Sequence, residues 1–237
     1  MIKSEELGNP SSTRAFNKPR FHISNKSLIE EDESLVSNHH GNIGEDKKLI
    51  HLLIGVTGSV AAIKVPELIQ QLNTENLFKI RIILTEGAQH FVTREEILKI
   101  DPSIECYTDE NEWKLWSKKG DPVLHIELRK WADIFAIVPL DCNTLAKISN
   151  GICDNLLTCV ARAWDIKTSP FIVAPAMNTL MWEHPFTSRQ LSILENELGV
   201  YIIEPISKLL ACGDKGNGAL ATVETIVQQI KAVVTTD

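Results

Sequence analysis

Residues that could do chemistry gather in the stretch 125–144, which reads HIELRKWADIFAIVPLDCNT. It opens with His125, whose imidazole can take up or release a proton near neutral pH. The apolar run at 133–140 predicts a strand buried on both faces, as in a parallel sheet. Four small residues follow that strand: Asp141, Cys142, Asn143 and Thr144. Either Asn143 or Thr144 can cap the next helix. Ligands of open α/β sheets bind at the carboxyl ends of strands, so this stretch predicts an active site.

Two other turns fall at predicted strand ends. The apolar run 49–56 is followed by Gly58 and Ser59 and then by a helical pattern. Gly58 allows a close backbone approach, Ser59 can cap the helix, and the helix N-terminus can attract a phosphate. Thr85 and Gly87 follow a second predicted strand at 79–85. An ordinary turn between strand and helix explains the same residues, because the full dinucleotide glycine fingerprint is absent.

Strands and helices alternate along the remaining chain. Further strands are expected within 169–178 and near 200–205, and the last helix near 221–234. Residues 101–122 are expected to form an irregular connection that carries Trp113 and Trp116, and residues 207–221 a glycine-rich loop. The pattern predicts an α/β fold: a three-layer, flavodoxin- or Rossmann-like parallel sheet with helices on both faces. One domain is expected over 49–237, preceded by a disordered polar tail over 1–48.

Composition narrows the possible partners. The 237 residues carry a net charge of −7, with no basic stripe for nucleic acid and no apolar run long enough to cross a membrane. The five cysteines are odd in number and lack the paired spacing of zinc ligands, so no metal is expected. A reducing compartment fits best. We expect a cytoplasmic protein, with a nuclear pool left open.

Four motifs then appear in order: TGSVAAIK at 57–64, HIELRKWAD at 125–133, PAMNTLMW at 175–182 and ACGDKGNGAL at 211–220. Together they resemble the motifs of the flavin-dependent cysteine decarboxylases. The resemblance is greatest to the eukaryotic phosphopantothenoylcysteine decarboxylases, which include halotolerance proteins. It spans roughly residues 48 to 234 and leaves out the tail.

The resemblance implies FMN as cofactor and a role for each matching residue. His125 matches the histidine of the oxidative decarboxylation, and Cys212 the cysteine that protonates the last intermediate. Asn178 matches the asparagine that grips the substrate; Lys130, Lys208, Ala211 and Leu220 are the other expected substrate contacts. The expected FMN contacts are Gly58, Ser59, Val60, Thr85, Gly87, Asp141, Cys142, Asn143, Thr144 and Ala176. A homotrimer with FMN between subunits is also implied.

The implied reaction is decarboxylation of 4′-phosphopantothenoylcysteine to 4′-phosphopantetheine in coenzyme A biosynthesis. Direct loss of CO2 would leave a carbanion with nowhere to delocalise. Oxidation by flavin gives a thioaldehyde, from which CO2 leaves to form an enethiol. The returned hydride and a proton complete a redox-neutral cycle.

The sequence departs from this pattern at three places. Asp141 and Cys142 stand where close relatives have serine and alanine, and a carboxylate beside a phosphate would repel it. Lys130 replaces an expected arginine, and a lysine offers a point charge in place of a planar fork. Leu209 replaces a basic residue. We expect these changes to affect the grip on substrate rather than the flavin or the reaction.

Other functions remain open at this point. Some fungal relatives are inhibitory subunits of a serine/threonine phosphatase, so a phosphatase partner is possible. Those regulators tend to lose one catalytic residue and to carry a long acidic C-terminal tail, whereas His125, Asn178 and Cys212 are all present here and no such tail is expected. A peptidyl-cysteine decarboxylase or a flavin prenyltransferase is a further alternative, and the histidine and cysteine motifs favour the small-molecule decarboxylase over both.

Overall fold

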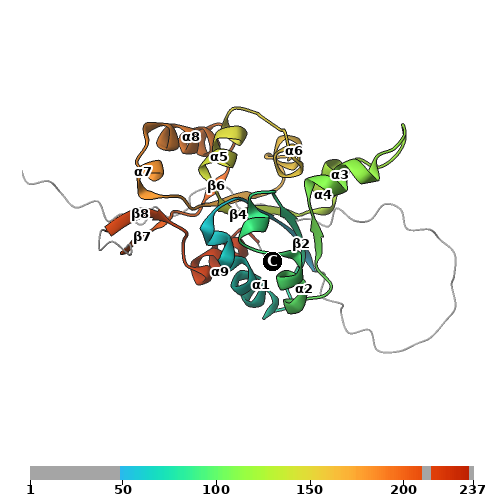
Figure 1. Ribbon diagram of the computed structural model, residues 1–237, viewed down its shortest axis with the longest axis horizontal. Helices are drawn as coiled ribbons and strands as arrows, with labels where there is room; N and C mark the ends of the chain where they lie inside the picture. The colour runs from blue at the N-terminus through green and yellow to red at the C-terminus, as the bar shows by residue number, and fades with distance from the viewer. Residues whose placement is uncertain (1–48, 210–214, 235–237) are drawn as a thin grey trace, which may run out of the picture.

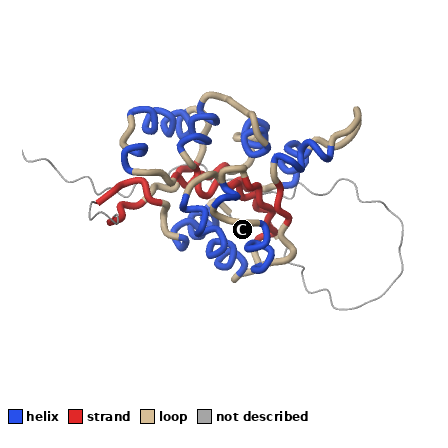
Figure 2. The backbone as a smooth tube through the Cα atoms, in the orientation of Figure 1, coloured by secondary structure: helices blue, strands red, loops and turns tan. Residues whose placement is uncertain are grey.

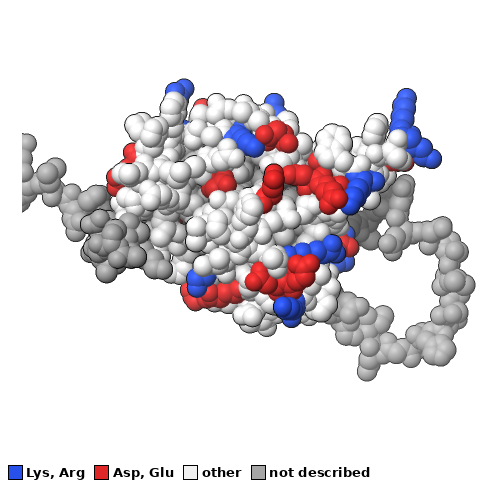
Figure 3. All heavy atoms as spheres, viewed as in Figure 1, with Lys and Arg blue, Asp and Glu red and all other residues white. Residues whose placement is uncertain are grey.

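The computed structural model describes residues 49–209 and 215–234. The predicted tail at 1–48 lies outside the described residues, as do Ala211 and Cys212. Within the described part, no helix combines the length and the apolar character that a membrane span requires. On the face drawn in Figure 3, acidic and basic side chains lie close together rather than forming a continuous basic stripe.

A six-stranded sheet forms the middle layer (Figure 1), and all its pairings are parallel. The strands are β1 (Ile50–Val56), β2 (Phe78–Leu84), β3 (Glu105–Tyr107), β4 (Ile134–Leu140), β5 (Phe171–Pro175) and β6 (Tyr201–Ile202). Their order is β3-β2-β1-β4-β5-β6, so the chain reverses its direction of winding between β1 and β4. This is the Rossmann-type order, in which ligands bind at that reversal. The predicted parallel α/β fold is confirmed.

Helices cover both faces of the sheet (Figures 1 and 2). One face carries α1 (Val65–Asn73), α2 (Arg94–Ile100) and α9 (Val223–Ala232); the other carries α4 (Leu124–Trp131), α5 (Cys142–Ser149), α6 (Leu156–Ala163) and α8 (Pro185–Asn196). Two hydrophobic clusters result because successive strand side chains point to opposite faces. Leu52 and Ile54 pack in the first cluster, whereas Leu53 packs in the second.

Strand β4 lies in the centre of the sheet, and all seven of its residues are buried. The ring centroid of Phe135 lies 4.8 Å from that of Phe171 and 5.3 Å from that of Trp164. The predicted strand at 133–140 is therefore confirmed to within one residue. It is hydrophobic along its whole length because neither of its faces meets water.

Two segments differ from their expected structure. The connection expected to be irregular contains β3 and a short helix, α3 (Asp109–Leu115). The start of α3 is stabilised by a capping box, in which Asn111 Oδ1 accepts the Thr108 N–H at 2.8 Å. This helix buries no residue, so no apolar period marked it.

The glycine-rich loop expected at 207–221 contains an antiparallel strand pair, β7 (Ile206–Leu209) and β8 (Lys215–Ala219). Backbone pairing and packing override the weak strand propensity of glycine here. Gly218 has φ +99°, and a Cβ at this position would lie 2.8 Å from the carbonyl oxygen of Met177. Only glycine fits this approach without strain.

Candidate active site

A cavity of about 840 Å³ lies where the winding reverses, at the carboxyl ends of β1, β4 and β5. We call it the switch-point cavity. Turns after these strands and the β7–β8 pair form its walls. Of the residues predicted to bind cofactor or substrate, it is lined by Gly58, Ser59, Val60, Asp141, Cys142, Asn143, Ala176, Asn178 and Leu220.

Thr57 fixes two of these turns to each other. Its buried hydroxyl donates to the carbonyl oxygen of Pro139 at 2.8 Å and accepts the N–H of Asp141 at 2.7 Å. Because both bonds are shielded from water, they hold the turn after β1 against the turn after β4. Sequence reasoning missed Thr57; the available signal was a hydroxyl residue directly after an apolar strand.

Thr85 and Gly87 do not line the cavity; they contact the end of β1 and the turn after it, which does. The Thr85 hydroxyl donates to the carbonyl oxygen of Val56 at 3.2 Å and accepts the N–H of Ala88 at 3.3 Å. A Cβ on Gly87 would lie 3.1 Å from the Cα of Gly58. The turns after β1 and β2 therefore touch backbone to backbone, at a spacing tighter than most Cβ contacts.

Ser59 begins the short 3₁₀ helix η1 (Val60–Lys64), and its hydroxyl accepts the N–H of Ala61 at 3.3 Å. Val60 and Ile63 on this helix are 65% and 57% exposed, so the cavity has an apolar rim on this side. The predicted cap at Ser59 is therefore present.

Asp141 caps α5, and its Oδ1 accepts the N–H of Thr144 at 2.7 Å. Its other oxygen faces Gly58, since a Cβ on Gly58 would lie 3.3 Å from Oδ2. The carboxylate thus takes one of the helix donors that could have met a phosphate. Thr144, an expected FMN contact, is buried and does not line the cavity.

Cys142 Sγ lies 3.8 Å from the sulfur of Met181, which also lines the cavity. Burial, and then the neighbouring Asp141 carboxylate, raise the pKa of the Cys142 thiol. At neutral pH this side chain is therefore a small apolar wall group.

Asn178 caps the short helix α7 (Thr179–Trp182), and its Oδ1 accepts the N–H of Leu180 at 2.9 Å. The side chain is exposed at the cavity wall. Ala176, just before it, donates its N–H to the carbonyl oxygen of Leu140 at 2.9 Å. The end of β5 is thereby fixed to the end of β4.

His125 lies in a second cavity of about 510 Å³, bounded by α3, α4 and the start of α6. We call it the histidine cavity. Trp113 and Trp116 line it and are 78% and 50% exposed. Within one chain, His125 and Asn178 thus belong to different cavities.

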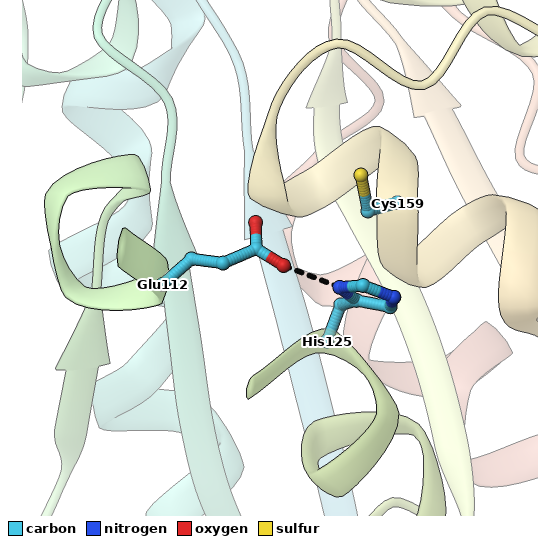
Figure 4. A group of neighbouring side chains, drawn as sticks. All are labelled: Glu112, His125 and Cys159. Carbon is cyan, nitrogen blue, oxygen red and sulfur yellow. Dashed lines mark hydrogen bonds and ion pairs between the residues drawn. The ribbon is translucent and has the colours of Figure 1, made fainter. Parts of the chain in front are cut away.

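The imidazole of His125 contacts Glu112 on α3 through Nδ1 (Figure 4). Cys159 on α6 lies beside this pair, with one polar atom from each of the three residues within 4.8 Å of the others. Sequence reasoning missed Glu112 and Cys159, because nothing in the spacing of the chain marks a pair formed between separate helices.

Three predicted substrate contacts remain: Lys130, Lys208 and Ala211. Lys130 lies at the far end of α4 from His125, where its Nζ donates to the Glu127 carboxylate at 3.1 Å. It lines neither cavity. Lys208 belongs to β7, but its side chain lies outside the described part, as do Ala211 and Cys212.

The switch-point cavity suits a flavin nucleotide. Its walls are largely apolar, with Val60 and Met181 available to a flat ring. Gly58 lines the cavity with bare backbone, and a Cβ there would lie 3.3 Å from both Asp141 Oδ2 and the Cα of Gly87. The Asp141 carboxylate at the start of α5 is less favourable, because it would repel a phosphate bound near it. Backbone N–H groups are then the donors best placed for the anion.

Comparison with known proteins agrees with this geometry. The flavoprotein family model matches residues 40–235. Phosphopantothenoylcysteine decarboxylase of Mus musculus is 46% identical over 192 residues, which cover 81% of this chain and 91% of the mouse protein.

Two solved structures agree in fold as well as in sequence. A phosphopantothenoylcysteine decarboxylase with a cysteine-to-serine mutation, complexed with pantothenoylaminoethenethiol, has a TM-score of 0.72 and 49% identity, covering 78% of this chain and 98% of that one. The FMN-binding protein AtHal3 has a TM-score of 0.71 and 49% identity, covering 78% and 96%. The chain therefore belongs to the flavoprotein family, among its phosphopantothenoylcysteine decarboxylases.

Proposed function

We propose that this protein decarboxylates 4′-phosphopantothenoylcysteine to 4′-phosphopantetheine with FMN as cofactor, a step of coenzyme A biosynthesis. The observation that carries the proposal is the 49% identical structure solved with pantothenoylaminoethenethiol. In an ethenethiol the sulfur-bearing carbon is itself one end of a carbon–carbon double bond. That is the state expected after CO2 has left and before a hydride and a proton are added.

Bound FMN would supply a reversible two-electron acceptor for the substrate's cysteine carbon. The chain's own residues bind the substrate and manage its protons. Asn178, exposed at the cavity wall, offers a donor and an acceptor to the carboxylate and the amide. His125 accepts the thiol proton, and Cys212 supplies the last one. Proton transfer of this kind contributes roughly 10²–10⁴-fold to a rate.

The catalytic assembly we propose is a homotrimer. The number of subunits follows from the family resemblance, and two observations support a site shared between subunits. His125 and Asn178 are both needed by the reaction, yet they line separate cavities of one chain. Both cavities also have exposed apolar residues at their rims: Val60, Ile63 and Met181 around the first, and Trp113 and Trp116 around the second. Apolar surface beside a half-formed site is typical of a subunit interface.

Mass spectrometry tests the reaction. The purified protein, incubated with phosphopantothenoylcysteine, should give a product lighter by CO2. His125→Asn should leave the substrate unchanged. Cys212→Ser should release CO2 but accumulate the unsaturated thiol, because a serine hydroxyl is a much weaker acid than a thiol. Unchanged substrate with FMN-loaded wild-type protein would refute the proposed reaction.

A mixing experiment tests the shared site. His125→Asn and Asn178→Ala are each expected to be inactive as pure trimers. Co-expressed, they form mixed trimers in which an intact His125 faces an intact Asn178 across some interfaces. Activity should therefore return. If each subunit contained its own complete site, every site of the mixed trimers would carry one of the two substitutions and remain inactive.

A further inference from the structure

The contact between Glu112 and His125 joins two helices that the rest of the fold holds in place. Helix α3 is fixed to the start of α6, where Asp109 Oδ1 accepts the N–H of Leu156 at 2.8 Å. Helix α4 is anchored by the buried side chains of Leu124 and Leu128. Both partners are sheltered, with side chains 14% and 25% exposed for Glu112 and His125. Such a pair is set by the scaffold rather than by chance contact at the surface.

The geometry distinguishes the two ring nitrogens of His125. Figure 4 shows the Glu112 carboxylate against Nδ1, with the other nitrogen directed away from it. An ionised carboxylate only accepts hydrogen bonds, so the proton of a neutral imidazole beside it lies on Nδ1. Nε2 then carries the lone pair. That tautomer is the one required for a base that acts through Nε2.

We propose that Glu112 is the positioning residue of His125, a role that rests on the proposed decarboxylase function. Glu112 holds the Nδ1–H tautomer and the orientation of the ring. When the substrate thiol reacts, its S–H bond breaks and an Nε2–H bond forms. The thiolate electron pair stays on sulfur, and the positive charge of the imidazolium is balanced by the Glu112 carboxylate.

An alternative role for this cluster is a metal site, with Glu112, His125 and Cys159 as the three ligands. One observation favours the positioning role. Glu112 and His125 are in direct contact, so an ion between them would have to separate the pair.

Three variants on α3 test the role. Glu112→Ala removes the acceptor, while Glu112→Gln keeps an acceptor oxygen of the same reach without the charge. Glu110→Gln is the matched control, because Glu110 is 72% exposed on the same helix and pairs only at the surface with Lys114. FMN absorbance and thermal unfolding verify that each variant is folded and loaded.

We expect Glu112→Ala to lower kcat by about 10²-fold with KM changed by less than about twofold, since the base is misdirected but substrate contacts remain. Glu112→Gln should lose less, and Glu110→Gln should match the wild type. If Glu112→Ala retained the kcat of Glu110→Gln, or if its fall in kcat only matched a loss of folded protein, the positioning role would be wrong.

Nitrogen NMR of the apoprotein labelled with ¹⁵N-histidine gives a second readout that needs no catalysis. The signals of His125 are identified by their loss in His125→Asn. In the wild type Nδ1 should carry the proton, and in Glu112→Ala the Nε2–H form should appear. An unchanged tautomer would overturn the proposal. So would a chelator that lowers the wild-type kcat when zinc restores it. Failure of the proposed reaction itself would show differently, as wild-type protein of the expected tautomer that makes no product.

Discussion

Gly58 and Gly87 lie back to back at the carboxyl edge of the sheet, so close that a Cβ on Gly87 would lie 3.1 Å from the Cα of Gly58. One belongs to the turn after β1 and the other to the turn after β2. Gly87 itself has φ −63°, a conformation that any residue can adopt. Its requirement for glycine is therefore one of space, imposed by a partner distant in sequence.

Gly87→Ala is expected to weaken FMN binding by about tenfold, equivalent to about 1.4 kcal/mol, because the added methyl group displaces the Gly58 turn. FMN titration monitored by flavin fluorescence measures this. Gly55→Ala is the control: its Cβ would meet the end of the Leu157 side chain at 2.7 Å, in the core and away from the turn. It should lower the temperature of unfolding but leave FMN affinity unchanged. Equal FMN affinity of Gly87→Ala and wild type would contradict a role of the Gly58–Gly87 contact in FMN binding.

Asp141 is predicted to have opposing effects on stability and on phosphate binding. Asp141→Asn keeps a side-chain acceptor for the Thr144 N–H, so the free energy of unfolding should change little. Asp141→Ala removes the cap and should cost about 1 kcal/mol, measured by urea denaturation.

Loss of the Asp141 charge should also tighten FMN more than riboflavin, because only FMN carries the phosphate. The ratio of the two dissociation constants for Asp141→Asn and wild type, at low ionic strength, isolates this effect. A ratio that does not change would mean that the phosphate lies away from Asp141.

Thiol reactivity should separate the described cysteines. Burial raises the pKa of Cys106 and of Cys159 to about 11 each. Below that pH both are protonated and unreactive, and their alkylation should accelerate only as the pH rises toward 11. Cys153 is exposed and should react first at pH 8. Peptide mapping after timed treatment with iodoacetamide measures the order; modification of Cys106 ahead of Cys153 would contradict the burial seen here.

The polar segment at 1–48 is expected to be dispensable for FMN binding and turnover. The first strand begins at Ile50, and the family model starts at residue 40, so two truncations are informative. Chains beginning at His40 and at Asp46 should both retain flavin and activity. Activity in the first and its loss in the second would assign a role to the few residues before β1. Loss in both would show that the segment docks on the domain.

The sequence alone determined the sheet and the turns of its carboxyl edge. Apolar runs such as 133–140 have no stable alternative to burial, and small residues after such runs mark where a chain turns closely past a ligand. The positions of Gly58, Ser59, Asp141 and Asn178 around one cavity follow from these local rules together with parallel order, because parallel strands end at the same edge.

Tertiary structure alone decided which residues meet across the fold. Thr57 with Pro139, Gly58 with Gly87, and Glu112 with His125 are contacts between separate elements, and no local period encodes them. Helix α3 escaped prediction because its capping box stabilises it without a buried face. The separation of His125 from the switch-point cavity could not be predicted from the sequence either. The order of the elements places His125 and that cavity at the same edge of the sheet, but it does not decide whether they share one cavity.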